Sequence, residues 1–161
     1  MTTWISEGAE QTRELGRRLG RMLRAGDLVL LHGDLGAGKT TFTQGLAEAL
    51  GVRGPVVSPT FIVARIHESA GDGPDLIHVD AYRIQDELDL ETLDLDTSLA
   101  DSVTVVEWGA GKAEVLSEDR LEIDFLAEAA TQDWTVAADE RRVLTLKPVG
   151  ADWAERLAKE N

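Results

Sequence analysis

A glycine-rich loop at residues 33–40, GDLGAGKT, is the feature that most constrains this chain. It matches the pattern G-x-x-x-x-G-K-[S/T] at every fixed position, with Gly33, Gly38, Lys39 and Thr40. Small residues let consecutive backbone N–H groups turn inward around a phosphate, and the following helix directs its positive end to the same point. The motif therefore predicts a phosphate site between a strand and a helix.

The sequence on both sides of the loop has the character that this prediction requires. Residues 28–32, LVLLH, form an almost continuous apolar run, which is typical of a strand buried on both faces in a parallel sheet. Residues 39–50 place Phe42 and Leu46 on one helical face before Gly51 ends the helix. The alternative is a glycine-rich turn without a ligand, and the match at four constrained positions disfavours it.

Further helices and strands are predicted along the rest of the chain. An apolar stripe predicts a helix over 7–25, and the acidic stretch 85–101 with its interspersed leucines predicts short helices over the sheet. A short amphipathic helix is predicted over 150–160. Apolar or alternating runs predict strands, of which the first two form a hairpin and the last two are antiparallel. These strands are expected within 57–68, 76–84, 103–108, 120–126 and 141–147.

These elements contain no internal repeat and no linker. We therefore expect one domain over residues 1–161, of the α/β class. Its expected architecture is three-layered, with a mixed, mostly parallel sheet that has an antiparallel part near the C-terminus.

The composition of the chain excludes several classes of protein. The net charge of −14 over 161 residues repels free nucleic acid, so any role on nucleic acid is expected to be indirect. The absence of cysteine excludes disulfides and thiolate metal sites. No apolar run approaches the ~20 residues that span a bilayer, and no secretory signal pattern opens the chain. These features predict a soluble cytoplasmic protein without a membrane partner.

The loop implies a triphosphate with Mg²⁺. The charge of Lys39 faces the β- and γ-phosphates in such loops, and the Thr40 hydroxyl ligates the metal. An acid at the end of a buried strand commonly completes the metal site. Asp80 ends LIHVD and Glu107 ends VTVVE. One could hold Mg²⁺ and the other could polarise the attacking water, and sequence spacing does not decide which. The alternative for either is a solvated carboxylate at a strand end.

Other side chains near these motifs have two interpretations each. Thr60, in SPTF, could sense the γ-phosphate as switch threonines do, or could belong to a Ser-Pro turn. Trp108 could stack near a nucleotide or fill the core, and the pattern alone favours the core. Tyr82 and Arg83 could anchor a catalytic loop or lie on the surface.

Together, the motifs GDLGAGKTTF, VSPTF, HVDAYR and VEWG resemble, in this order and spacing, those of the TsaE (YjeE) family. The resemblance covers roughly residues 5–147. That family is the small ATPase component of the bacterial machinery that makes threonylcarbamoyladenosine at position 37 of tRNA. The resemblance implies a P-loop ATPase fold with an atypical strand order, ATP and Mg²⁺ as ligands, and weak ATP hydrolysis. It also implies docking on the proteins TsaB and TsaD, the latter being the transferase, with tRNA engaged only indirectly.

The resemblance also assigns roles to the loop and its neighbours. It implies that residues 36–41 cradle the phosphates and that Thr40 and Glu107 hold Mg²⁺. It moves Trp108 from the core to the vicinity of the nucleotide. The predicted nucleotide-binding residues are Gly33, Gly36, Ala37, Gly38, Lys39, Thr40, Thr41 and Trp108.

Two further sets of residues follow from the same resemblance. Asp80 and Thr60 match the family's HxDxYR and SPT motifs, which are expected near the γ-phosphate. With Lys39 they are the predicted catalytic residues. A segment around Ala9 and Thr12 is expected near the base.

Two other functions stay open on the residues alone. A small-molecule kinase closes an arginine-bearing lid over the transferred phosphate, and the acidic stretch 85–101 contains no arginine. A regulatory nucleotide sensor fits Thr60 and the two acids as well as an ATPase does. The chain lacks an N-K-x-D guanine signature, which disfavours a GTPase.

Overall fold

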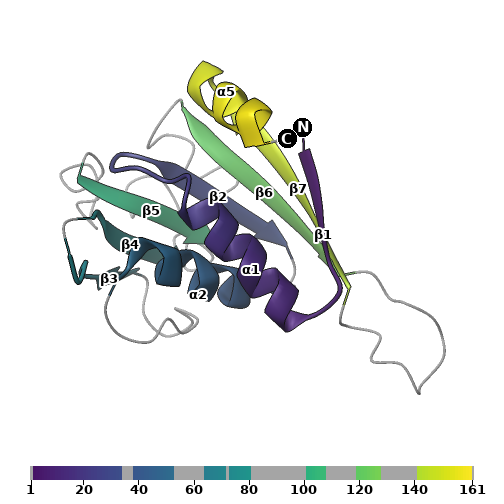
Figure 1. The fold of residues 1–161 in the computed structure, drawn as a ribbon, viewed down its shortest axis with the longest axis horizontal. Coiled ribbons are helices and arrows are strands. Elements are labelled where there is room, and N and C mark those ends of the chain that lie inside the picture. Colours follow the sequence, from purple (N-terminus) through teal and green to yellow (C-terminus); the bar gives the residue numbers. More distant parts are fainter. Residues whose placement is uncertain are drawn as a thin grey trace.

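The computed structural model describes seven stretches of the chain, which form a seven-stranded sheet with helices packed on it (Figure 1). The described residues are 2–33, 38–52, 64–71, 73–80, 101–107, 119–127 and 141–160. In chain order the elements are β1 (Thr2–Ser6), α1 (Ala9–Gly20), β2 (Leu28–Gly33), α2 (Lys39–Leu50), β3 (Ala64–His67), β4 (Asp75–Asp80), β5 (Ser102–Glu107), β6 (Arg120–Ala127), β7 (Arg142–Val149) and α5 (Ala151–Glu160).

The strand order across the sheet is β1-β7-β6-β2-β5-β4-β3. The four central strands, β6, β2, β5 and β4, run parallel to one another. On one side β7 and β1 continue the sheet antiparallel, and on the other side β3 pairs antiparallel with β4. This confirms the predicted α/β class, the mostly parallel centre and the antiparallel C-terminal part. The predicted helices over 85–101 lie outside the described residues except for residue 101.

The apolar run before the phosphate loop occupies the middle of this sheet. Strand β2 lies between β5 and β6, and the side chains from Leu28 to Leu31 are fully buried. A central strand buried on both faces is the structure that an unbroken apolar run favours. The loop is therefore attached to the most deeply buried strand of the sheet.

The N-terminal strand β1 is absent from the elements that the sequence predicts. It pairs with β7, with Thr3 opposite Thr145 and Ile5 opposite Val143. Trp4 is buried and Ile5 is exposed, so the strand alternates as an edge strand with one covered face should. Five residues give a weak signal alone, because their partner strand lies more than a hundred residues away in the chain.

Helix α1 ends earlier than its apolar stripe predicts, at Gly20 in place of residue 25. The backbone N–H of Met22 donates to Leu19 O at 2.9 Å, and that of Leu23 donates to Gly20 O at 3.3 Å. These i→i+3 bonds tighten the last turn and end the helix. Leu23 still reaches the core after the helix has ended, which explains why the periodicity extends beyond it.

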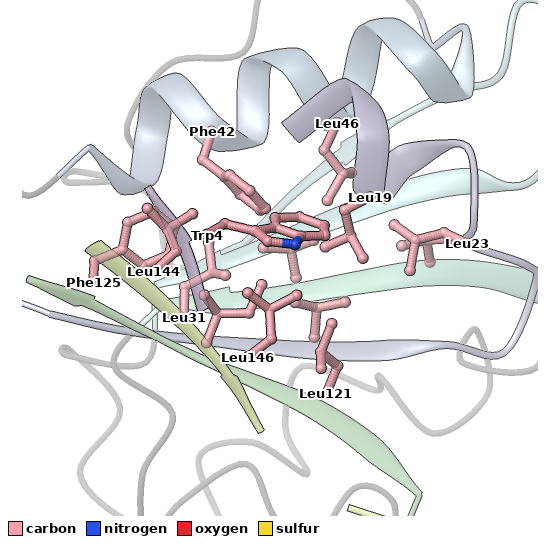
Figure 2. Packing of buried hydrophobic residues seen from close by; sticks show 14 of the residues in the cluster. Trp4, Leu19, Leu23, Leu31, Phe42, Leu46, Leu121, Phe125, Leu144 and Leu146 are labelled. Carbon is pink, nitrogen blue, oxygen red and sulfur yellow. The ribbon is translucent and has the colours of Figure 1, made fainter. Parts of the chain in front are cut away.

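One face of the sheet and the two long helices enclose the main core, with Trp4 between them (Figure 2). Phe42 of α2 meets Phe125 of β6 edge to face, with ring centroids 5.3 Å apart and planes at 82°. The cluster contains residues from the strands and from helices α1, α2 and α5. It comprises Trp4, Leu19, Leu23, Val29, Leu31, Phe42, Leu46, Ala47, Leu76, Val103, Val105, Leu121, Ile123, Phe125, Leu144, Leu146, Trp153 and Leu157.

Helices α1 and α2 cross with their backbones in direct contact. A Cβ atom at Gly16 would lie 2.0 Å from the Phe42 carbonyl oxygen, and one at Gly45 would lie 1.9 Å from the Arg13 carbonyl oxygen. Only glycine fits where backbones approach this closely. The contact fixes the height of α2 over the sheet, and with it the start of α2 at the phosphate loop.

The C-terminal helix α5 confirms the predicted helix over 150–160 and is tied to the turn before β2. Trp153 and Leu157 add their side chains to the core, and both are almost fully buried. The Arg156 guanidinium donates to both oxygens of Asp27, at 2.6 and 2.9 Å. The Asp27 carboxylate raises the pKa of Arg156 above its ordinary value. The arrangement is a bidentate ion pair between a guanidinium and a carboxylate that are both largely buried.

Candidate phosphate and metal site

The carboxyl ends of three neighbouring parallel strands meet at one edge of the sheet. In the register, Leu31 of β2 lies opposite Glu107 of β5, and Glu107 lies opposite Asp80 of β4. Strand β2 then runs two residues further, to Gly33, where the glycine-rich loop begins. In open α/β sheets this edge is where ligands bind. The fold thus brings Glu107 beside the strand that carries the loop and places Asp80 one strand further along the same edge.

The start of α2 is suited to an anion. Gly38 precedes the helix with φ of +99°, a left-handed conformation that favours glycine. Among the residues that the structure describes, no side chain caps this helix start, and the first turn carries no acidic residue. The first N–H groups of a helix have no partner within the helix, and together they carry a partial positive charge. A phosphate can supply what a capping side chain supplies elsewhere.

Lys39 belongs to the glycine-rich motif and is the first residue of α2. Its side chain is almost fully buried, and the ammonium donates to Gly33 O at 2.7 Å. The lysine therefore reaches back from the first residue of α2 to the last residue of β2. This bond places the positive charge of the ammonium beside Gly33, the first residue of the glycine-rich loop. Thr40 and Thr41 follow on the first turn of α2 and are half-buried.

Glu107 faces the protein interior and not the solvent. It is 5% exposed, and its Oε2 lies 3.1 Å from Nε2 of His78, whose side chain is fully buried. A carboxylate is rarely buried without a partner or a function, because loss of hydration is costly. For Glu107, the alternative of a solvated strand-end acid is therefore wrong. Asp80 is placed here by the backbone register alone.

Two side chains from distant parts of the sequence border Gly38. A Cβ atom at Gly38 would lie 3.5 Å from Thr12 Cγ2 and 3.8 Å from Arg142 Nε. Thr12 is buried on α1, and its hydroxyl lies 2.6 Å from that of Ser6. Thr12 thus lies beside Gly38, and its expected place near the base stays a prediction from the sequence.

His78 and Arg142 are candidate site residues that the sequence analysis misses. His78 is the first residue of the motif HVDAYR, and that motif is the signal that could have indicated it. Arg142 reaches the loop only because β7 pairs with β1 and β6, with Ser6 and Ala127 as its register partners. No local pattern distinguishes it from a surface arginine at a strand end.

The remaining predicted positions are not described by the structure. Gly36 and Ala37 of the loop, Thr60 and Trp108 lie outside the described residues, as do Tyr82 and Arg83. Their roles stay predictions from the sequence.

A family model described as "Threonylcarbamoyl adenosine biosynthesis protein TsaE" matches residues 6–136. The chain belongs to the TsaE family. A TsaE protein from Streptomyces coelicolor is 61% identical over 143 residues, which are 88% of this chain and 93% of the relative. A TsaE protein from Mycobacterium leprae is 52% identical, over 84% of this chain and 92% of its own.

More distant comparisons agree with this assignment. A TsaE protein from Bacillus subtilis is 37% identical over 91% of this chain and 85% of its own. The crystal structure of YdiB from the same species superposes with a TM-score of 0.74 at 30% identity, over 98% of this chain and 92% of YdiB. The α/β fold with its mixed sheet is thus shared with a solved relative. Among the helices that the structure describes, none is long and apolar enough to cross a membrane.

The donor groups at this site fit a magnesium–triphosphate ligand. Within the described residues, no group of three or more His, Asp or Glu side chains could hold a metal alone. Mg²⁺ is commonly bound by only one or two protein oxygens together with substrate phosphates. The Thr40 hydroxyl at the start of α2 and the buried carboxylate of Glu107 are oxygen donors of this kind.

Proposed function

We propose that this chain binds ATP with Mg²⁺ at the glycine-rich loop and hydrolyses it to support threonylcarbamoyl modification of adenosine 37 in tRNA. Membership of the TsaE family supports a role in threonylcarbamoyl adenosine biosynthesis. The observation that carries the finer proposal is the meeting of two features at one sheet edge. These are the buried carboxylate of Glu107 and the strand that leads into the lysine-bearing loop.

Each described residue of the site has a distinct task in this proposal. The first backbone N–H groups of α2 donate to the β-phosphate, and Lys39 turns its ammonium from Gly33 O toward the β- and γ-phosphates. Thr40 and Glu107 hold Mg²⁺, which when bound neutralises charge on the phosphates. Asp80, next to Glu107 in the register, orients and polarises the attacking water.

Further positions complete the proposed nucleotide site. The positive charge of Arg142 beside Gly38 adds attraction for the phosphates. Thr60 is proposed near the γ-phosphate and Trp108 near the nucleotide, and Thr12 near the base. The adenine preference follows from the absence of a guanine signature.

The proposed partners are the proteins TsaB and TsaD, with the group transfer itself performed by TsaD. The net charge of −14 disfavours direct capture of tRNA by this chain, since a polyanion repels a polyanion. Hydrolysis would thus act on the partner complex, in the cytoplasm, and the tRNA would be reached through it.

Substitutions in the loop and at the metal position test this proposal. We expect Lys39→Ala to abolish ATP binding at concentrations that saturate the unchanged protein. We expect Glu107→Ala to reduce phosphate release on the order of 10²- to 10³-fold. Matched controls are Lys159→Ala and Glu48→Ala, which alter exposed residues away from the loop and should change neither quantity.

The same variants are then assayed for modified tRNA in a mixture with TsaB, TsaD, tRNA and the threonylcarbamoyl donor. Repeated rounds of modification should fail with Lys39→Ala and Glu107→Ala and continue with the two controls. Full modification with either site variant would overturn the ATPase proposal. If ATP only switched binding to TsaB and TsaD and released no phosphate, a regulatory sensor would replace it.

A further inference from the structure

A buried histidine makes direct contact with the proposed metal ligand. The imidazole of His78 is fully buried in β4, and its Nε2 lies 3.1 Å from Oε2 of Glu107, which is itself 6% exposed at the side chain. His78 has Val105 as its register partner, so Glu107 is its diagonal neighbour on the adjacent parallel strand. The contact joins two central strands at the sheet edge where the phosphate loop begins.

We infer that His78 is a positioning residue that holds the Glu107 carboxylate in one orientation toward Mg²⁺. This inference rests on the proposed function of the site. A carboxylate rotates about its last carbon–carbon bond unless one of its oxygens is held. An ionised carboxylate is an acceptor only, so the imidazole must donate from Nε2 to Oε2. Mg²⁺ demands near-ideal octahedral geometry, and partners that orient its ligands therefore affect its affinity.

The cost of burying His78 supports a role beyond packing. Its other ring nitrogen, Nδ1, is buried and has no hydrogen-bond partner in the described structure. A leucine of similar size would fill this space without leaving a polar atom unpaired. What the imidazole supplies, and an apolar side chain cannot, is the hydrogen bond to Glu107.

Two substitutions separate the hydrogen bond from the packing. His78→Leu removes the donor and keeps a bulky side chain in the space. His78→Gln keeps an N–H donor on a chain long enough to reach Glu107. The matched control is His67→Leu, because His67 is also buried in the same hairpin, with Leu76 as its register partner.

The direct measurement is the affinity of Mn²⁺, as a magnetic substitute for Mg²⁺, for the complex of the protein with ATP, followed by electron paramagnetic resonance. We expect His78→Leu to weaken Mn²⁺ about 10- to 100-fold, the usual effect of losing a partner that orients a ligand. His78→Gln should regain most of that affinity, and His67→Leu should match the unchanged protein. ATP affinity without divalent metal should stay the same in all three variants.

The alternatives give different results. Unchanged Mn²⁺ affinity in folded His78→Leu would overturn the inference, and so would an equal loss in His78→Gln, because the shape of the ring would then be what matters. If His78→Leu does not fold, His78→Gln decides by keeping or losing metal affinity. A Glu107→Ala control separates the two proposals. If it too binds Mn²⁺ normally, then the metal assignment in the proposed function fails, and not only the role of His78.

Discussion

The contact between α1 and α2 predicts that Gly45→Ala destabilises the protein, although alanine is the better helix former. A Cβ atom at Gly45 would lie 1.9 Å from the Arg13 carbonyl oxygen, about 1.5 Å short of the 3.4 Å at which ordinary contact begins. The obstacle is helix backbone, which cannot rotate aside as a side chain does. The two helices must therefore move apart or tilt.

The expected size follows from two opposing terms. Overpacking a well-packed contact costs about 1–3 kcal/mol, and the rigid obstacle here places this site near the upper end. Replacing glycine in a helix returns about 1 kcal/mol. The net loss is about 2 kcal/mol of unfolding free energy. In a protein of this size that lowers the melting temperature by about 4–8 °C.

Thermal and urea unfolding without nucleotide measure this loss directly. Gly71→Ala is the control, because a Cβ there meets none of the described residues within 4 Å, and it should unfold like the unchanged protein. Gly16→Ala should resemble Gly45→Ala, and the double variant should lose less than the sum, since one separation of the helices relieves both clashes. ATP affinity should fall too, because α2 carries Lys39. A stabilised Gly45→Ala variant would refute the close backbone contact.

Three other expectations can be checked in parallel. Arg142→Gln should lower the affinity for ATP roughly 10-fold, because loss of a charged contact costs about 1.4 kcal/mol. Arg141→Gln, at the next residue, should leave the affinity unchanged. Equal ATP titration curves for the two variants would remove Arg142 from the site. Arg156→Ala leaves the buried carboxylate of Asp27 without its charged partner and should cost about 3 kcal/mol in urea unfolding, against less than about 1 kcal/mol for the exposed Arg21→Ala; similar losses would mean that the α5 ion pair is not buried in solution. ATP should be hydrolysed in preference to GTP, and equal turnover of the two would count against an adenine site.

Local patterns predict much of this fold. The apolar run before the loop predicts a buried central strand, and Leu28 to Leu31 are fully buried there. Gly51 ends α2 as predicted, with φ of +72°. The hairpin of β3 and β4 and the antiparallel pairing of β6 and β7 also agree with the sequence. These features depend on the period of nearby residues and on backbone preferences, both of which a short stretch carries by itself.

The candidate site likewise has features that a local pattern predicts and features that depend on tertiary packing. The loop pattern predicts roles for Lys39 and Thr40 without any tertiary information, because phosphate binding by backbone N–H groups is a local property. It also predicts that an acid will follow a buried strand, and it offers Asp80 and Glu107. Pattern cannot show that Glu107 is buried, because exposure at a strand end depends on what packs against it.

The sequence by itself therefore determined the class of fold, and it predicted the glycine-rich loop as a phosphate site with a pair of candidate acids. Only the tertiary structure decided which residues stand next to them. His78 contacts Glu107 from the neighbouring strand, and Arg142 lies near Gly38 although about a hundred residues separate them in the chain. Strand β1 likewise forms by pairing with β7, which lies more than a hundred residues away in the chain. The physical reason is that propensity and periodicity act over a few residues, whereas strand register and helix contact depend on pairing between segments that the sequence separates.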